Sequence, residues 1–373
     1  MVVLGSTGSI GVNTLEIAKR YSIKIEGLVA GNNYKLLNTQ IREFKPKFVV
    51  VKDKETAEKI DFKNVKYGEE AILEVIENSK SDLIVNALVG DAGLRPTLKA
   101  QECGKKIALA NKESLVNAGK FIDTSKITPI DSEHFGLWYL LSEKCKVKNE
   151  KCNFKKLYIT ASGGALRDWD LEDIKKATLK DVLNHPNWSM GVKITIDSAT
   201  MVNKLFELLE AKWLFNTTDI DAFIETKSII HALVEWIDGS TTAHISKTDM
   251  KLPIAFAILD EVKDEILKPV NLLEVGGLEF RKIEPEKYPV WEIKDLLLKN
   301  PDLGVVVNTA NEFAIEMFLN EKISFMDISK VILKAVQKFE IVNVNSLDDV
   351  FEIKKEIKGW CESNFIRFGR NAY

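Results

Sequence analysis

The sequence is poor in cysteine and histidine, has no long apolar run and has no excess of either charge. Its 373 residues include four cysteines without a CxxC pair, namely Cys103, Cys145, Cys152 and Cys361, and this favours free thiols in a reducing cytoplasm. No apolar run approaches the roughly 18 residues that a membrane helix needs. Only Met1 precedes the first apolar segment, so we expect no signal peptide.

The charge balance excludes another class of function. The chain has 52 basic and 55 acidic residues and a formal net charge of −3, which predicts no bulk attraction to nucleic acid or to an anionic membrane. An anion would therefore need a local binding site. The length is too great for one ordinary core, and we expect two or three domains.

The first motif is VVLGSTGSIG, residues 2–11, in which Gly5, Gly8 and Gly11 recur every three residues. Apolar residues followed by glycines and an amphipathic segment predict a strand, a tight turn and a helix, the first unit of a dinucleotide-binding fold. The helix N-terminus would bind a pyrophosphate, and glycine would let the backbone approach it. The spacing is not the usual GxGxxG, so an ordinary strand–helix turn is the alternative.

A second strand is predicted over residues 23–31, and its tip reads Ala30-Gly31-Asn32-Asn33. No carboxylate stands there to repel a 2′-phosphate, so NADP is favoured over NAD; simple turn chemistry is the alternative for the asparagines. Further strands are predicted over residues 47–51, 82–88 and 105–110, with helical segments between them. The first 125 or so residues therefore resemble one doubly wound sheet.

Acidic residues in two segments suggest a metal site. Asp131 and Glu133 would lie on one face of an extended backbone, and two adjacent carboxylates suit Mg²⁺ or Mn²⁺; a solvated acidic turn is the alternative. Glu207, on one helix face with Asn203, could be a third ligand. Lys204, Asn203 and Ser198 could hold a phosphate, although Lys204 and Glu207 also fit an exposed i,i+3 pair.

Two more stretches have chemical character. ITASGGAL, residues 159–166, predicts a strand that opens into an anion-binding nest at Ser162, or else an ordinary turn. LNHPNWSMGVK, residues 183–193, predicts a loop that could close over a ligand, with Trp188 excluding water. The alternatives are a helix cap for His185 and a core anchor for Trp188.

Six motifs occur in order along the chain: GSTGSIG, LANKESLV, PIDSEHF, TASGGALRDW, HPNWSMG and KITIDSATMVNK. Together they closely resemble the 1-deoxy-D-xylulose 5-phosphate reductoisomerase family of non-mevalonate isoprenoid biosynthesis, and the resemblance extends at least to NTANEFA, residues 308–314. It implies a homodimer that converts 1-deoxy-D-xylulose 5-phosphate to 2-C-methyl-D-erythritol 4-phosphate. It also implies NADPH and a divalent metal, Mg²⁺, Mn²⁺ or Co²⁺, as cofactors.

The resemblance assigns roles to matching positions. The residues implied to bind NADPH are Thr7, Gly8, Ser9, Ile10, Gly31, Asn32, Asn33, Asn111, Glu113 and Gly191. The implied metal ligands are Asp131, Glu133 and Glu207. The implied substrate-binding residues are Lys112, Ser132, Glu133, Ser162, His185, Ser198, Asn203, Lys204 and Glu207. The implied catalytic set is Lys112, Glu133, His185 and Trp188, with Met190 beside Trp188 on the lid; the general base could be Lys112 or a metal-bound water.

The chain departs from the family pattern at two places. Many members have a basic residue where Asn32 stands here, so a charge-assisted bond worth about 1.5–3 kcal/mol would be lost unless Lys35 supplies it. Leu205-Phe206 replaces the usual Gly-Leu, and the larger side chain at Leu205 would crowd the helix turn near the metal.

The expected fold class is α/β, with an N-terminal Rossmann-like parallel sheet, a central α+β domain whose sheet is mostly antiparallel, and a C-terminal helical bundle. We expect the NADPH-binding domain over residues 1–124 and the catalytic and dimerisation domain over 125–262, with a lid at 182–192. A linker over 263–288 and a helical domain over 289–373 would follow. The rival functions are a metal-free NADP-dependent semialdehyde or sugar-phosphate dehydrogenase, and a non-catalytic NADP sensor.

Overall fold

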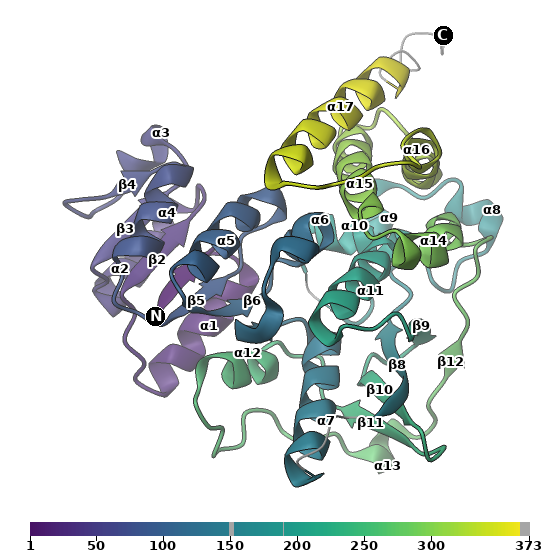
Figure 1. The fold of residues 1–373 in the computed structure, drawn as a ribbon, viewed down its shortest axis with the longest axis horizontal. Helices are drawn as coiled ribbons and strands as arrows, with labels where there is room; N and C mark the ends of the chain where they lie inside the picture. Colours follow the sequence, from purple (N-terminus) through teal and green to yellow (C-terminus); the bar gives the residue numbers. More distant parts are fainter. Residues whose placement is uncertain (149–152, 189, 366–373) are drawn as a thin grey trace. The chain divides into compact units, whose positions relative to one another are not determined.

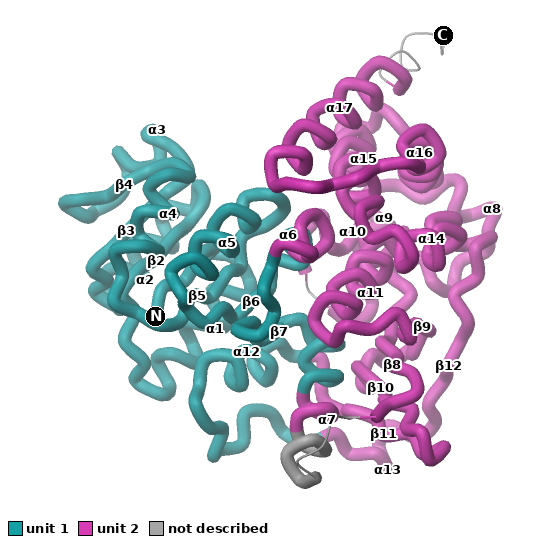
Figure 2. Tube along the Cα trace, viewed as in Figure 1, with its two compact units in different colours: residues 1–114, 122–138, 249–269 teal, residues 115–121, 139–248, 270–373 magenta. Residues whose placement is uncertain are grey.

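The computed structural model describes residues 1–148, 153–188 and 190–365. The chain divides into two units (Figure 2): residues 1–114, 122–138 and 249–269 form unit 1, and residues 115–121, 139–248 and 270–373 form unit 2. Free thiols are confirmed at Cys103 and Cys361, whereas Cys145 and Cys152 fall outside the described side chains. Among the described residues, no helix is long and apolar enough to cross a bilayer.

Unit 1 is built on a seven-stranded parallel sheet in the order β4-β3-β2-β1-β5-β6-β7. The strands are β1 (Val2–Leu4), β2 (Gly27–Ala30), β3 (Phe48–Val51), β4 (Lys66–Tyr67), β5 (Leu83–Asn86), β6 (Lys106–Leu109) and β7 (Ile127–Pro129). The strand order reverses between β1 and β5, which is where open α/β sheets bind ligands at the carboxyl ends of their strands.

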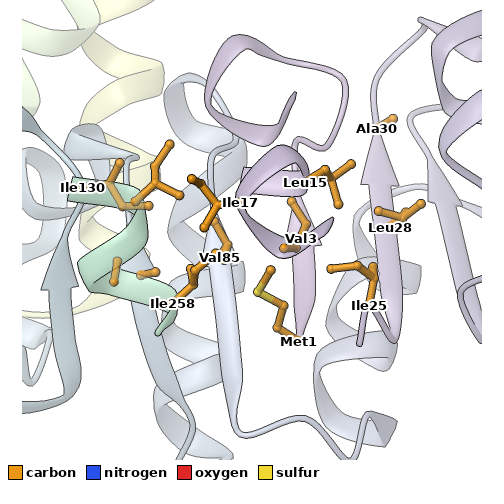
Figure 3. Packing of buried hydrophobic residues seen from close by; sticks show 14 of the residues in the cluster. Met1, Val3, Leu15, Ile17, Ile25, Leu28, Ala30, Val85, Ile130 and Ile258 are labelled. Atoms are coloured by element: carbon orange, nitrogen blue, oxygen red, sulfur yellow. The ribbon is translucent and has the colours of Figure 1, made fainter. Parts of the chain in front are cut away.

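Helices connect these strands. They are α1 (Ser9–Arg20), α2 (Tyr34–Phe44), α3 (Lys54–Ala57), α4 (Glu69–Asn78), α5 (Leu94–Glu102) and α12 (Lys251–Ile258), and α6 (Lys112–Ala118) and α7 (Ser132–Lys148) begin in unit 1 and continue in unit 2. Figure 3 shows the core, where Val3 and Val85 of the sheet meet Ile17 of α1 and Ile258 of α12. The helix α12 therefore packs with unit 1, although the predicted domain boundaries grouped it with the catalytic region.

Unit 2 contains a mixed sheet in the order β11-β10-β8-β9-β12. Its strands are β8 (Phe154–Ala161), β9 (Ile220–Glu225), β10 (Ile230–Trp236), β11 (Thr241–Ile245) and β12 (Phe280–Arg281). β8 and β9 are parallel and the other pairs are antiparallel, as predicted. The hairpin predicted at Asp238-Gly239 is confirmed between β10 and β11, with Gly239 at a φ of +85°.

The helices of unit 2 are α8 (Leu171–Ile174), α9 (Leu179–Val182), α10 (Val192–Thr200), α11 (Val202–Phe215), α13 (Leu272–Val275), α14 (Lys294–Lys299), α15 (Leu303–Leu319), α16 (Phe325–Lys338) and α17 (Leu347–Phe365). Helices α15, α16 and α17 pack together as the C-terminal helical bundle (Figure 1). The α17 helix starts at the predicted capping box, because Ser346 and Asp349 exchange side-chain to backbone bonds.

The predicted fold class is confirmed, with two local differences. The second strand is shorter than expected, since β2 begins at Gly27 rather than near Ile23. The segment predicted as a linker contains α13 and β12, and β12 pairs with β9 in the sheet of unit 2. β12 could not be predicted, because a strand of two residues between glycines and prolines shows no alternation of apolar and polar residues.

Candidate functional site

The glycine turn of unit 1 connects β1 to α1, as predicted. Gly5 has a φ of +85°, and a Cβ there would lie 2.4 Å from the carbonyl oxygen of Ala87. A Cβ on Gly11 would lie 2.2 Å from the carbonyl oxygen of Gly5. Gly8 is different, because it is exposed at the start of α1 and a Cβ there would meet only Gly5 at 3.4 Å. Close internal packing thus explains Gly5 and Gly11, and only Gly8 leaves space where a phosphate could approach.

Thr7 and Ile10 are partly buried in the same turn, and Ser9 is exposed. At the tip of β2, residues 31–33 are all exposed. The side chain of Asn33 accepts a bond from the Leu36 amide at 3.3 Å and caps helix α2. The turn chemistry considered for this tip is therefore present at Asn33, and Asn32 and Lys35 stay exposed beside it.

The acidic pair of unit 1 lies at the end of β7 and the start of α7. The two residues were expected on an extended backbone, and this is wrong, because α7 begins at Ser132 and Glu133 lies in its first turn. An Asp131 carboxylate oxygen accepts the Glu133 amide at 3.2 Å, and such capping favours the helix over a strand. Carboxylate oxygens of Asp131 and Glu133 still lie within 4.8 Å of each other.

Basic groups surround Asp131. Lys112 Nζ donates to Asp131 Oδ2 at 2.8 Å, and His134 Nδ1 lies 2.9 Å from Asp131 Oδ1. Lys112 and His134 are buried, and Ser132 Oγ donates to Glu133 Oε2 at 2.9 Å. The sequence analysis missed His134, although its position three residues after Asp131 on a helix was a readable signal.

Asn111 and Glu113 lie at the start of α6 and are buried. The Asn111 amide nitrogen donates to the carbonyl oxygens of Leu88 and Gly90 at 2.9 and 2.8 Å, and it lies 3.2 Å from Glu113 Oε2. These hydrogen bonds of Asn111 stabilise the loop that follows β5, next to the switch point of the sheet.

In unit 2, α10 and α11 meet at Met201, a non-glycine residue in the left-handed region with a φ of +70°. The Asn203 amide donates to Glu207 Oε1 at 2.5 Å, and Lys204 Nζ bonds Glu207 Oε2. Lys204 and Glu207 are 4% and 1% exposed, so the alternative of an exposed ion pair is wrong. Leu205 and Phe206 are buried, and α11 runs through them without interruption.

Ser162, His185 and Ser198 come together in unit 2 from the end of β8, the loop after α9 and helix α10. His185 Nε2 lies 2.9 Å from Ser162 Oγ and 3.5 Å from Ser198 Oγ, and the two hydroxyl oxygens are 3.3 Å apart. The Gly164 amide also donates to Ser162 Oγ at 3.1 Å. Positive φ angles at Gly163 and Gly164 turn the chain here, which fits both an anion-binding nest and an ordinary turn.

The bonds to His185 define its protonation. Its Nδ1 accepts the amides of Asn187 and Trp188 at 3.1 and 3.0 Å, so the ring proton sits on Nε2 and can be donated to Ser162. Burial, with the nearby Arg167 charge, lowers the pKa of His185 from 6.5 to about 4. His185 is therefore a neutral hydrogen-bond donor at neutral pH and not a helix cap.

The lid predicted at residues 182–192 includes Ser189, which lies outside the described residues. Trp188 and Met190 are partly buried, and the Trp188 ring makes an edge contact with His231, centroids 6.2 Å apart. Gly191 is exposed at the start of α10, with open space around it. The sequence analysis also missed Asn187 and Arg167, which bind backbone carbonyls around this loop.

These features define a class of protein. A parallel sheet with a glycine turn after its first strand, at the switch point, is typical of proteins that bind dinucleotides. Three family models narrow the class: the 1-deoxy-D-xylulose 5-phosphate reductoisomerase model matches residues 1–119, and two models of its C-terminal domains match residues 127–215 and 245–360. The chain belongs to the 1-deoxy-D-xylulose 5-phosphate reductoisomerase family.

Individual relatives agree along the full length. The 1-deoxy-D-xylulose 5-phosphate reductoisomerase of Nautilia profundicola is 87% identical over 98% of this chain and 100% of its own, and that of Campylobacter hominis is 52% identical over 97% and 99%. A reductoisomerase structure in complex with NADPH, fosmidomycin and magnesium is 32% identical, with a TM-score of 0.91, and covers 99% of this chain and 98% of its own. The Zymomonas mobilis enzyme in complex with NADPH is 30% identical, with a TM-score of 0.86 over the same shares.

Proposed function

We propose that this chain is a metal-dependent NADPH reductoisomerase that converts 1-deoxy-D-xylulose 5-phosphate to 2-C-methyl-D-erythritol 4-phosphate in isoprenoid biosynthesis. The observation that carries the proposal is the 87% identity to such an enzyme over 98% of the chain. The buried polar groups suit this reaction, because a sugar phosphate needs some groups that bind its phosphate and others that bind its hydroxyl and carbonyl oxygens.

NADPH would be held in unit 1. Its pyrophosphate would meet the N-terminus of α1 at Thr7, Gly8, Ser9 and Ile10, where Gly8 leaves the backbone open. Its 2′-phosphate would lie at the exposed tip formed by Gly31, Asn32 and Asn33, with Lys35 close by. Asn111, Glu113 and Gly191 would line the nicotinamide end. When bound, NADPH supplies the hydride for the reduction.

The metal would be held by the carboxylates of Asp131, Glu133 and Glu207. Hard oxygen donors suit Mg²⁺, Mn²⁺ or Co²⁺, and the short approach between Asp131 and Glu133 fits a shared cation. When bound, the metal supplies a Lewis acid that stabilises negative charge developing on the substrate oxygens. Lys112 offsets charge on Asp131, and Lys204 offsets charge on Glu207.

The substrate phosphate would be bound in unit 2 by Ser162, His185, Ser198, Asn203 and Lys204. His185 presents its Nε2 proton toward the two serine hydroxyls, so neutral donors meet the phosphate together with the Lys204 ammonium. Binding this remote group fixes the carbon chain, and binding energy from a non-reacting group can lower the barrier at the reacting carbons.

Other residues of the chain would act near the reacting carbons. Ser132 and Lys112 would contact the sugar oxygens, and the Lys112 ammonium is placed to hold or donate a proton there. Trp188 and Met190 on the lid would cover the sugar and exclude water.

The two rival functions make different demands. A semialdehyde dehydrogenase would need a nucleophilic cysteine in a catalytic loop, whereas Cys361 is buried and its pKa is raised to about 12 by desolvation. An NADP sensor would have no use for three carboxylates and a buried lysine next to a phosphate site. Cys361 therefore does not support the semialdehyde dehydrogenase, and the sensor leaves the proposed metal ligands without a role.

We also propose that the protein is a cytoplasmic homodimer with the domain roles expected from the sequence: NADPH binding over residues 1–124, catalysis and dimerisation over 125–262, a linker over 263–288 and a helical domain over 289–373. The β11 edge of the unit 2 sheet would pair across the dimer.

Product analysis tests the activity. The purified protein, supplied with 1-deoxy-D-xylulose 5-phosphate, Mn²⁺ and NADPH, is expected to form 2-C-methyl-D-erythritol 4-phosphate, identified by NMR, with one NADPH consumed per product. Formation of an unbranched polyol phosphate would favour the simple dehydrogenase instead.

A further inference from the structure

Arg167 lies next to the proposed phosphate site but is not part of it. Its guanidinium Nη1 donates to the carbonyl oxygens of Ser162 and Thr226 at 2.8 and 2.9 Å. The side chain is only 12% exposed, and its stem covers Gly163, where an added Cβ would lie 2.6 Å from Arg167 Cγ. One nitrogen of Arg167 thus joins the Ser162 loop to the turn between β9 and β10.

The turn between β9 and β10 is itself firmly held. Glu225 is fully buried, and its carboxylate accepts the amides of Lys227, Ile229 and Ile230 at 2.8, 2.8 and 3.2 Å. A buried carboxylate with three amide donors is well satisfied. The Thr226 carbonyl therefore has a defined position and can serve as a fixed point for other segments.

The segment that carries His185 is attached to the same turn. The Asn187 side-chain amide donates to the Thr226 carbonyl oxygen at 3.0 Å and to Ser228 Oγ at 2.7 Å. Asn187 also donates its backbone amide to His185 Nδ1. The Thr226 carbonyl thus accepts one bond from Arg167 and one from Asn187.

Further contacts fix Arg167 itself. Its Nε and Nη2 both bond Asp168 Oδ2, and Asp168 Oδ1 accepts a bond from Arg281 at 2.6 Å. The backbone carbonyls of Gly163 and Arg167 accept bonds from Tyr288 and Lys287 at 2.8 and 2.6 Å. The guanidinium fork therefore has little freedom to leave the two carbonyls.

We propose that Arg167 is a positioning residue for the phosphate site, which holds the Ser162 loop and the His185–Trp188 segment in register through their shared attachment to the β9–β10 turn. The inference rests on the proposed phosphate-binding role of Ser162 and His185. Arg167 does not touch substrate in this account. It sets the spacing between the Ser162 hydroxyl and the His185 ring, and two donors bind one phosphate well only when that spacing is held.

The test compares Arg167→Met with Arg95→Met, since Arg95 also bonds carboxylates, those of Glu69 and Glu70 at 2.6 and 2.9 Å, but belongs to unit 1 and has no part in holding the Ser162 loop. For Arg167→Met, we expect the dissociation constant of 1-deoxy-D-xylulose 5-phosphate, measured by calorimetry, and its KM to rise about 10-fold or more. The dissociation constant of NADPH is expected to change by less than about twofold in Arg167→Met, and the binding constants of Arg95→Met are expected to change by no more than that. If Arg167→Met does not fold, Arg167→Lys keeps the charge without the fork, and the same rise is expected.

A double-mutant cycle with Asn187→Ala adds a readout that a general loss of structure would not give. Both side chains act through one carbonyl. The fold-loss of substrate affinity in the double variant is therefore expected to be smaller than the product of the fold-losses in the two single variants. The inference would be overturned if the substrate affinity of Arg167→Met stayed within about twofold of the wild-type value. It would also be overturned if the affinity of this variant for NADPH fell in parallel. Failure of the wild type to bind the substrate would overturn the phosphate site itself, and this outcome is distinct from the others.

Discussion

At the residue scale, two lysines pair with carboxylates of the proposed metal site in buried or nearly buried positions. Lys112 bonds Asp131 in unit 1, and Lys204 bonds Glu207 in unit 2. A buried charge is tolerated only when a partner and hydrogen bonds compensate for its lost hydration. The two lysines therefore offset the charge of Asp131 and Glu207, two of the proposed metal ligands.

Glu133→Gln tests the proposed metal ligand, because the amide keeps the shape but not the charge. We expect turnover to fall at least about 100-fold, with NADPH binding measured by fluorescence unchanged. Glu58→Gln, at an exposed carboxylate of unit 1, is the matched control and should keep full turnover. Turnover of Glu133→Gln near the wild-type value would refute the assignment.

Asn32→Asp tests the proposed position of the 2′-phosphate. A carboxylate there would repel the phosphate and could bind a ribose hydroxyl, so the ratio of kcat/KM for NADPH to that for NADH should fall about 10-fold or more. Asn64→Asp adds the same charge at another exposed site of unit 1 and should leave the ratio unchanged. An unchanged ratio in Asn32→Asp would place the 2′-phosphate elsewhere.

The protonation of His185 gives a pH prediction. Its folded pKa of about 4 lies below the ordinary value of 6.5, so the stability that it contributes is complete above pH 6.5 and is lost as the pH falls toward 4. NMR of ¹⁵N-labelled histidine should therefore show His185 neutral, with the proton on Nε2, at pH 6. A His185 resonance that titrates near pH 6.5 would contradict this.

At the element scale, helix starts and tight turns present the proposed binding groups. α1 begins at the glycine turn, α7 begins at the acidic pair, and α10 and α11 join at the left-handed Met201. A non-glycine residue in this conformation costs of order 1 kcal/mol or more. In return, the bend at Met201 lets Ser198 and Asn203 lie at the facing ends of two different helices.

The glycine turn offers an element-scale prediction with its own control. Gly11→Ala pushes a Cβ against the Gly5 carbonyl and should destabilise unit 1 by about 3 kcal/mol, measured by amide hydrogen exchange in β1. Gly8→Ala has space for the methyl group and should fold normally but raise the KM for NADPH. Equal stability of the two variants would show that the packing account of Gly11 is wrong.

At the scale of the whole molecule, the two units contribute different parts of the proposed chemistry. In the proposal, unit 1 would hold NADPH and contains Asp131 and Glu133, and unit 2 would bind the substrate phosphate and contains Glu207. Four strands of unit 1 were predictable, because β1, β3, β5 and β6 are mostly apolar and lie between turn residues. The strands β4 and β7 were not predicted. The family was also predictable, because six long motifs occur along the chain in the order that is typical of that family.

Other features were out of reach of sequence reasoning. Glu133 looked extended because alternation over three residues cannot reveal a helix cap. The contacts of Arg167 and Asn187 could not be predicted, because both side chains bond backbone carbonyls, and such bonds leave no pattern of residue types in the sequence. The packing of α12 with unit 1 depends on contacts between residues more than 200 positions apart along the chain.

The most direct test of the central claim is NADPH oxidation with pure 1-deoxy-D-xylulose 5-phosphate before and after metal removal. The account predicts rapid oxidation with Mn²⁺, loss of the activity in EDTA, and full recovery when excess Mn²⁺ is added back. Substrate-dependent oxidation that continues at the same rate in EDTA, or no oxidation under any of these conditions, would contradict it.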